Sequence, residues 1–92
     1  MAISGQKTVT AAGTAEALGS QIVNAALMVK ALPTNTGLVY IGNDGAGDVS
    51  SQNGMPLQAG DVALFDFVGN LADVKVDSAV NGEGVAWLIL SA

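Results

Sequence analysis

Short apolar runs, separated by residues that favour turns, restrict the fold of this 92-residue chain more than any other feature. The longest uninterrupted apolar run covers residues 85–90, far short of the ~20 residues that a membrane-spanning helix needs. Clusters of Gly, Asn, Asp, Ser and Pro separate the other runs. This pattern predicts an all-β protein, a small antiparallel β-sandwich or jelly-roll-like barrel of about six to seven strands.

Apolar residues alternate with other residues over 21–31, where Leu27 and Val29 share one phase. A period of two is typical of a strand with one face on the core, although the good helix formers in this segment leave a helix as the alternative. Pro33 and the turn residues after it lead into residues 38–41, which are dense in strand formers. We therefore expect 21–31 and 38–41 to form a β-hairpin.

The middle of the chain predicts one long loop and two further strands. Residues 43–54 contain nearly every residue type that breaks regular structure, so they predict the loop. Residues 56–61 predict a turn into a strand over 62–67, whose mixed pattern favours burial on both faces. Residues 73–77 alternate charge with valine, which is typical of a half-exposed strand.

The two ends of the chain differ in hydrophobicity. Residues 84–90 predict the most hydrophobic and most central strand, entered from a tight turn with positive φ at 81–84. Residues 1–20 are mostly Ala, Gly, Thr and Ser and can bury little. They fit either an edge strand near 7–11 or an arm that orders on a partner, beside a β-sandwich domain over 21–92.

Composition argues against several classes of function. The chain has no cysteine and no histidine, so it lacks disulfides, thiolate-metal sites and the usual general base near neutral pH. Its net charge of -5 with three basic residues argues against binding nucleic acid or an anionic membrane. No secretory signal is evident, so we expect synthesis in a cytoplasm. A small core without disulfides makes oligomerisation the expected support.

Eight acidic residues are the main candidates for chemistry. Asp44 and Asp48 resemble part of a calcium loop, but a single copy without a distal Glu favours plain turn residues. Asp66 lies between two Phe residues and is expected to face solvent or a partner, while Glu83 is expected at a loop tip. The serines at 50–51 have no histidine to activate them. We therefore predict no enzyme, no metal site and no cofactor.

Three stretches carry a resemblance to a known group: ALPTNTGLVYIGNDG, SSQNGMPLQAGD and LADVKVDSAVNGEGVAWLIL. They look like the small virion proteins of tailed bacteriophages, in the group of capsid decoration (cement) and head-fibre-like proteins. The resemblance covers about two thirds of the chain and consists of turns and strands. It implies a β-sandwich that forms homotrimers and binds the outside of a phage shell, between subunits of the major capsid protein.

The function expected on this basis is a structural virion protein at the capsid surface, made in the host bacterial cytoplasm. The candidate contact residues are Ile3, Lys7, Val9, Tyr40, Asp44, Asp48, Asn53, Asp73 and Lys75. Asp73 and Lys75, together with Asp77, either neutralise one strand face or form a salt bridge to a neighbouring subunit. The alternative function is a receptor- or carbohydrate-binding module of a phage fibre, using Tyr40 or Trp87. A two-carboxylate hydrolase ranks last.

Overall fold

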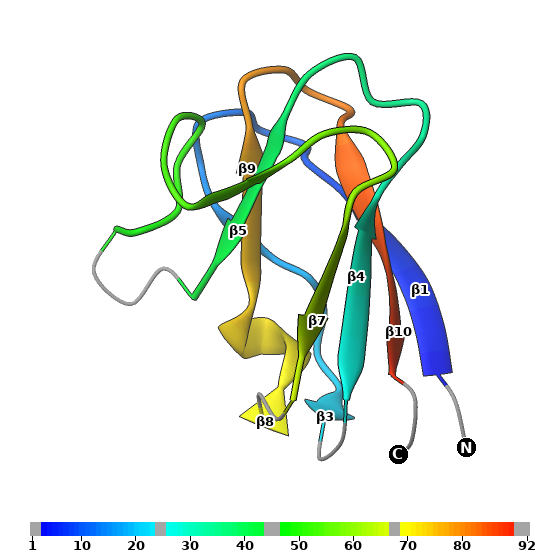
Figure 1. The fold of residues 1–92 in the computed structure, drawn as a ribbon. Coiled ribbons are helices and arrows are strands. Elements are labelled where there is room, and N and C mark those ends of the chain that lie inside the picture. Colours follow the sequence, from blue (N-terminus) through cyan, green and yellow to red (C-terminus); the bar gives the residue numbers. More distant parts are fainter. Residues whose placement is uncertain (1–2, 24–25, 44–46, 67–68, 90–92) are drawn as a thin grey trace.

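The structure is a computed structural model that describes residues 3–23, 26–43, 47–66 and 69–89 (Figure 1). In chain order its elements are β1 Ile3–Thr8, β2 Glu16–Ala17, β3 Ile22–Val23, β4 Leu27–Ala31, β5 Val39–Gly42, β6 Met55–Leu57, β7 Val62–Phe65, β8 Gly69–Asn70, the 3-10 helix η1 Leu71–Asp73, β9 Lys75–Ser78 and β10 Gly84–Ile89. The predicted all-β class is confirmed. The strands outnumber the six or seven expected, because several have only two or three residues.

Two four-stranded antiparallel sheets form a sandwich (Figure 1). Sheet A has the strand order β1-β10-β4-β7, and sheet B has the order β2-β9-β5-β6. The short strands β3 and β8 pair in a separate two-stranded ribbon, at the end of the sandwich where β1 begins and β10 ends.

Strand pairing is nested around the middle of the chain. β1 pairs with β10, β2 with β9, β3 with β8, β4 with β7 and β5 with β6. In four of these five ladders, the two residue numbers of every pair add up to the same total. The pairs Ile3 with Ile89, Glu16 with Val76 and Leu27 with Phe65 are examples. The chain is thus one long hairpin whose successive pairs fall in sheet A, sheet B, the separate β3-β8 ribbon, sheet A and sheet B. This is the connectivity of a jelly roll.

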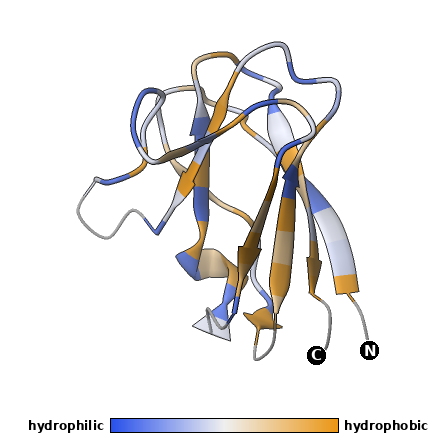
Figure 2. Ribbon diagram, in the orientation of Figure 1, coloured by the Kyte–Doolittle hydropathy of each residue, from blue (hydrophilic) through white to orange (hydrophobic). Residues whose placement is uncertain are grey.

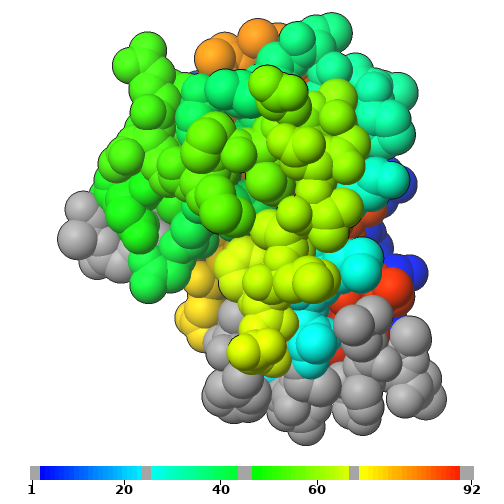
Figure 3. All heavy atoms as spheres, in the orientation of Figure 1, coloured from blue at the N-terminus to red at the C-terminus, as the bar shows by residue number. Residues whose placement is uncertain are grey.

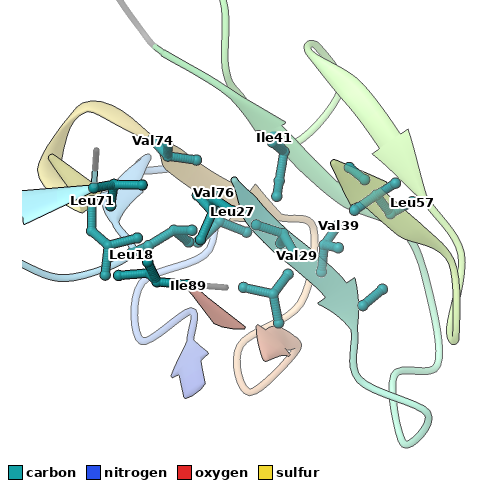
Figure 4. Packing of buried hydrophobic residues seen from close by; sticks show 14 of the residues in the cluster. Leu18, Leu27, Val29, Val39, Ile41, Leu57, Leu71, Val74, Val76 and Ile89 are labelled. Carbon is teal, nitrogen blue, oxygen red and sulfur yellow. The ribbon is translucent and has the colours of Figure 1, made fainter. Parts of the chain in front are cut away.

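Alternate residues of the facing strands build the core between the sheets (Figure 4). In β4, Leu27 and Val29 are fully buried while Lys30 is exposed, so the predicted period of two is confirmed and the helix alternative is wrong. Sheet B contributes Val39 and Val76 from the opposite side. Figure 2 shows hydrophobic residues along β4 and β7, whereas β1 is mostly near neutral.

The predicted hairpin between 21–31 and 38–41 is wrong. β4 lies in sheet A and β5 in sheet B, so the residues between them cross from one sheet to the other. A side chain fixes this crossing: Asn35 donates from Nδ2 to the Gly84 carbonyl oxygen at 2.9 Å and accepts the Gly84 N–H at 3.0 Å. Asn35 therefore takes the place of a strand partner at the start of β10.

Burial on both faces of residues 62–67 is also wrong for the part that the structure describes. β7 belongs to sheet A, and only one face of that sheet packs against sheet B. Ala63 is buried on that face, whereas Val62 and Leu64 point to solvent. Phe67 lies outside the described residues.

The first strand has the place of the predicted edge strand, but it spans Ile3–Thr8 and forms an edge of sheet A beside β10. The predicted positive φ occurs at Gly82, where φ is 92°. Gly84 is required for a different reason: a Cβ there would collide with the Lys7 carbonyl oxygen of β1. The turn and the close approach of β1 thus depend on two different glycines.

Candidate interaction surface

Even-numbered side chains of sheet A point away from sheet B, on a surface that we call the outer face of sheet A. The register aligns them in two rows across the sheet, Gln6-Ala86-Lys30-Val62 and Ser4-Leu88-Met28-Leu64. Their odd-numbered neighbours in β4 and β10 lie largely in the core. Each row is therefore polar on β1 and mostly apolar from β10 to β7.

The apolar part of the outer face is open to solvent. Leu64 is 68% exposed and Val62 is 49% exposed, and Figure 3 shows β7 at the surface beside β4. A shallow hollow of about 450 Å³ lies on the same face, lined among others by Met28, Lys30 and Leu88. Exposed apolar patches with polar margins are typical of sites that contact other proteins.

The outer face of sheet B is covered at one end by the connection between β1 and β2. Asp77 of β9 is fully buried there, and the Gly13 N–H of the covering connection donates to Asp77 Oδ1 at 2.9 Å. The Ala12 N–H donates to Asn81 Oδ1 at 2.7 Å and fixes the same connection. The predicted exposure of Asp77 on a half-exposed strand is therefore wrong.

A cluster around Glu16 links the two sheets where β1 and β2 form their edges. Glu16 Oε1 lies 2.8 Å from Lys7 Nζ, and Glu16 Oε2 accepts the N–H groups of Thr10 and Ala11 at 2.9 and 3.0 Å. The hydrogen bond from Lys7, followed by that from Ala11, lowers the pKa of Glu16 from 4.5 to about 2. Since Lys7 belongs to sheet A and Glu16 to sheet B, this ion pair ties the sheets together.

Glu83 holds the crossing between β4 and β5. Its carboxylate accepts the Thr36 N–H and hydroxyl, each at 2.9 Å, and the Gly37 N–H at 2.8 Å. Burial raises the pKa of Glu83, but these hydrogen bonds outweigh burial, so the pKa lies below 4.5. Glu83 is thus a buried residue that fixes the connection between β4 and β5. The prediction of Glu83 as a loop-tip residue missed this role, because its hydrogen-bond partners are more than forty residues away in the sequence.

The predicted contact residues of the N-terminal segment do not form a separate arm. Ile3 packs against the core, and Lys7 is paired with Glu16. Val9 is only 1% exposed, and its backbone pairs with Glu83 and Gly82. The Val9 side chain is therefore part of the core of the single chain, and a contact of Val9 with a partner stays a prediction.

The other predicted contact residues belong to sheet B and its connections. Tyr40 and Lys75 are half-buried on strands of sheet B. Three are exposed outside the strands: Asp48, Asn53 and Asp73. Asp44 lies outside the described residues. The structure brings none of the residues it describes from this set onto the apolar outer face of sheet A.

Sequence reasoning missed the residues that do form that face: Met28, Leu88, Val62 and Leu64. A strand that is apolar in both phases favours burial on both sides, and this pattern concealed them. One available signal was the position of Asp61 and Asp66 directly beside the ends of the short strand β7. Charged residues that flank a hydrophobic strand are typical of strands that solvent can reach.

Comparison with models of known protein families gave no match, and no curated protein proved similar to the chain. Within the described ranges, no helix is long and apolar enough to cross a membrane. The same residues contain no group of three acidic side chains placed to hold a metal ion.

Proposed function

We propose that the protein is a structural virion protein, a capsid decoration (cement) protein that binds the outer surface of a tailed-phage shell and stabilises it. Its partners are the major capsid protein and further copies of itself in a homotrimer. It acts without catalysis or a cofactor, and its partners are neither nucleic acid nor membrane. The phage setting and the trimer rest on the resemblance of the three sequence stretches described above.

The apolar outer face of sheet A is the observation that carries this proposal. A small sandwich without disulfides has limited stability, yet Val62 and Leu64 contribute only part of their apolar surface to it, because about half of Val62 and two thirds of Leu64 remain exposed to water. Burying such side chains against a partner contributes roughly 1–3 kcal/mol each. Lys30 is the only charged side chain in the two rows of this face, and the cores of protein interfaces are depleted in charge.

A decoration protein acts by mass action. It binds the assembled lattice and not the dispersed subunits, so it shifts the equilibrium towards the assembled shell. This function needs no reactive side chain, which agrees with a sequence that has neither histidine nor cysteine. It does need a contact surface that keeps its shape, which a sheet face provides.

The proposal is tested by the mass of the purified protein in solution and by its sedimentation with capsids stripped of it. Light scattering is expected to give three times the chain mass of 9.1 kDa, and binding to capsids is expected to saturate. A monomer that leaves the capsids unoccupied contradicts the proposal. That result would favour the fibre-module alternative, to be followed by glycan-array binding.

Paired variants locate the contact. Met28 and Leu88 are register neighbours on the outer face, so Met28→Gln with Leu88→Gln is expected to weaken capsid binding at least tenfold. The matched control is Val80→Gln, because Val80 is 53% exposed but lies between β9 and β10, outside the sheet faces. Equal binding by both variants would assign the contact to another surface.

A further inference from the structure

The four edge strands of the two sheets differ in their protection against pairing with another strand. β2 has only two residues, and β6 contains Pro56, which has no N–H to donate. β1 carries Lys7 on its inward-facing side, paired with Glu16. Short strands, prolines and inward charges all hinder edge-to-edge pairing. β7 has four residues, with no proline and no charge among them.

The hydrogen-bond phase of β7 leaves polar backbone groups on its open side. The Ala31 N–H donates to the Asp61 carbonyl oxygen at 2.9 Å, so the odd-numbered residues of this ladder bond to β4. In an antiparallel ladder the intervening residues direct their N–H and C=O groups to the other side. Val62 and Leu64 therefore present both a free backbone edge and exposed apolar side chains.

Acidic residues lie at both ends of this edge. Asp61 and Asp66 are exposed, and Asp61 is held in place by the Gln58 N–H at 2.9 Å. Antiparallel pairing of β7 with β7 of a second copy would bring Asp61 of one chain towards Asp66 of the other, and parallel pairing would align identical residues. Like charges oppose either arrangement. Charge complementarity favours a different chain with basic residues at these positions.

We infer that the open edge of β7 receives an extended segment of a different protein, which adds a fifth strand to sheet A. This segment has apolar side chains opposite Val62 and Leu64 and a Lys or Arg beside Asp61 and Asp66. Main-chain hydrogen bonds supply affinity, and alternate side chains supply selectivity. The identity of the partner as the shell protein rests on the proposed function. The open edge and its preference for a basic partner rest on the structure alone.

A peptide titration tests the edge directly. The probe is the capped peptide Lys-Thr-Val-Thr-Val-Lys, which in antiparallel register places valines opposite Leu64 and Val62. It is added to the full chain labelled with nitrogen-15 while the amide signals are followed. The signals of Val62 and Leu64 are expected to shift, and the same peptide methylated on both valine nitrogens is expected to produce no shift. Shifts that persist with the methylated peptide would overturn the inference.

A charge exchange tests the flanking residues. Replacing the first lysine of the peptide, opposite Asp66, with glutamate is expected to weaken binding about fivefold. Asp66→Lys is expected to reverse this preference, so that the glutamate peptide binds better. A pairwise coupling of this kind identifies a specific contact and not a general charge effect. Loss of binding to both peptides in Asp66→Lys would contradict the arrangement.

Proline variants compare the two edges of sheet A. Leu64→Pro removes an outward N–H from β7 and is expected to abolish the peptide-induced shifts. Gln6→Pro removes the equivalent outward group from β1 and is expected to leave them unchanged, since Gln6 lies in the open phase of its ladder. If Leu64→Pro does not fold, the methylated peptide provides the same information in the unaltered chain.

The outcomes separate this inference from the proposed function. Peptide binding at β7 in a protein that ignores capsids would refute the decoration function and leave the edge inference intact. Capsid binding without any peptide-induced shift at Val62 and Leu64 would support the decoration function and overturn the edge inference. Shifts of these two signals with protein concentration alone would show pairing with a second copy and overturn the inference.

Discussion

The two long sides of the sandwich are built differently. On the side of β1 and β2, Lys7 and Glu16 join the sheets through an ion pair, and the connection after β1 covers part of sheet B. On the side of β7 and β6, the turn at residues 58–61 joins the sheets, and the apolar edge of β7 stays open. We call these the closed side and the open side.

This difference separates what stabilises the fold from what remains for a partner. On the closed side, the Glu16 carboxylate has its partners within the chain, since it accepts four hydrogen bonds from Thr10 and Ala11 in addition to its ion pair with Lys7. On the open side, apolar side chains meet water. Substitutions on the closed side should therefore change stability, and those on the open side should change binding.

The largest expected effect is at Gly84, where the backbone of β1 lies very close beside β10. Gly84→Ala is expected to lower the free energy of unfolding by about 3 kcal/mol, because the new methyl group displaces the Lys7 carbonyl and strains the ladder. Urea denaturation measures the change. The control on the open side is Gly60→Ala: Gly60 has φ 87° but free space around it, so about 1 kcal/mol is expected from backbone strain alone. Equal losses would remove the close approach as the cause.

The next effect is at the ion pair of the closed side. Glu16→Gln removes the charge that Lys7 and two backbone N–H groups recognise, and is expected to cost on the order of 1.5 kcal/mol. The matched control is Asp66→Asn on the open side, expected to stay within about 0.5 kcal/mol. The shift in urea midpoint at constant slope compares the two variants. A control as costly as Glu16→Gln would mean that the two sides do not differ in this respect.

Acid is expected to weaken both the closed side and the crossing between β4 and β5. The pKa of Glu16 is about 2 in the folded chain and that of Glu83 is also below 4.5, so the unfolded chain takes up protons first as pH falls. Their stabilisation is complete above pH 4.5 and is lost as pH falls from there towards 2. The melting temperature is expected to fall by on the order of 5 °C between about pH 6 and pH 3. Glu16→Gln should show a smaller fall in circular-dichroism melting curves, and an equal fall would exclude Glu16 as a cause.

The sequence was sufficient to predict the local features of the fold. The inward phase of β4, the positive φ at Gly82 and the all-β class all follow from alternation and turn chemistry over a few residues. Pairing was not predictable in the same way, because a strand such as β4 does not reveal whether its partner is the next strand or one far along the chain. The wrong hairpin arose from this limit.

The candidate surface was harder to predict, for a related reason. Leu64 and Leu27 are both leucines in apolar strands, yet one is 68% exposed and the other is fully buried. The difference depends on which face of sheet A each side chain occupies: Leu64 lies on the outer face and Leu27 on the face that packs against sheet B, and this assignment is a property of the tertiary structure. The opposite error occurred for two acidic residues: Asp77 and Glu83 were expected at the surface but are buried, with hydrogen-bond partners that are distant in the sequence.

The smallest expected effect tests whether the outer face of β7, on the open side, is exposed to solvent in the free protein. Val62→Thr keeps a β-branched side chain in the edge strand, and Val62 is 49% exposed, so the free energy of unfolding is expected to change by less than about 0.5 kcal/mol. The same substitution at the fully buried Val29, on the neighbouring strand, leaves a hydroxyl in the core and is expected to cost about 2 kcal/mol. Urea denaturation of both variants gives the comparison. If Val62→Thr costs as much as Val29→Thr, the outer face of β7 is covered in the free protein, and no partner strand can use it without first displacing what covers it.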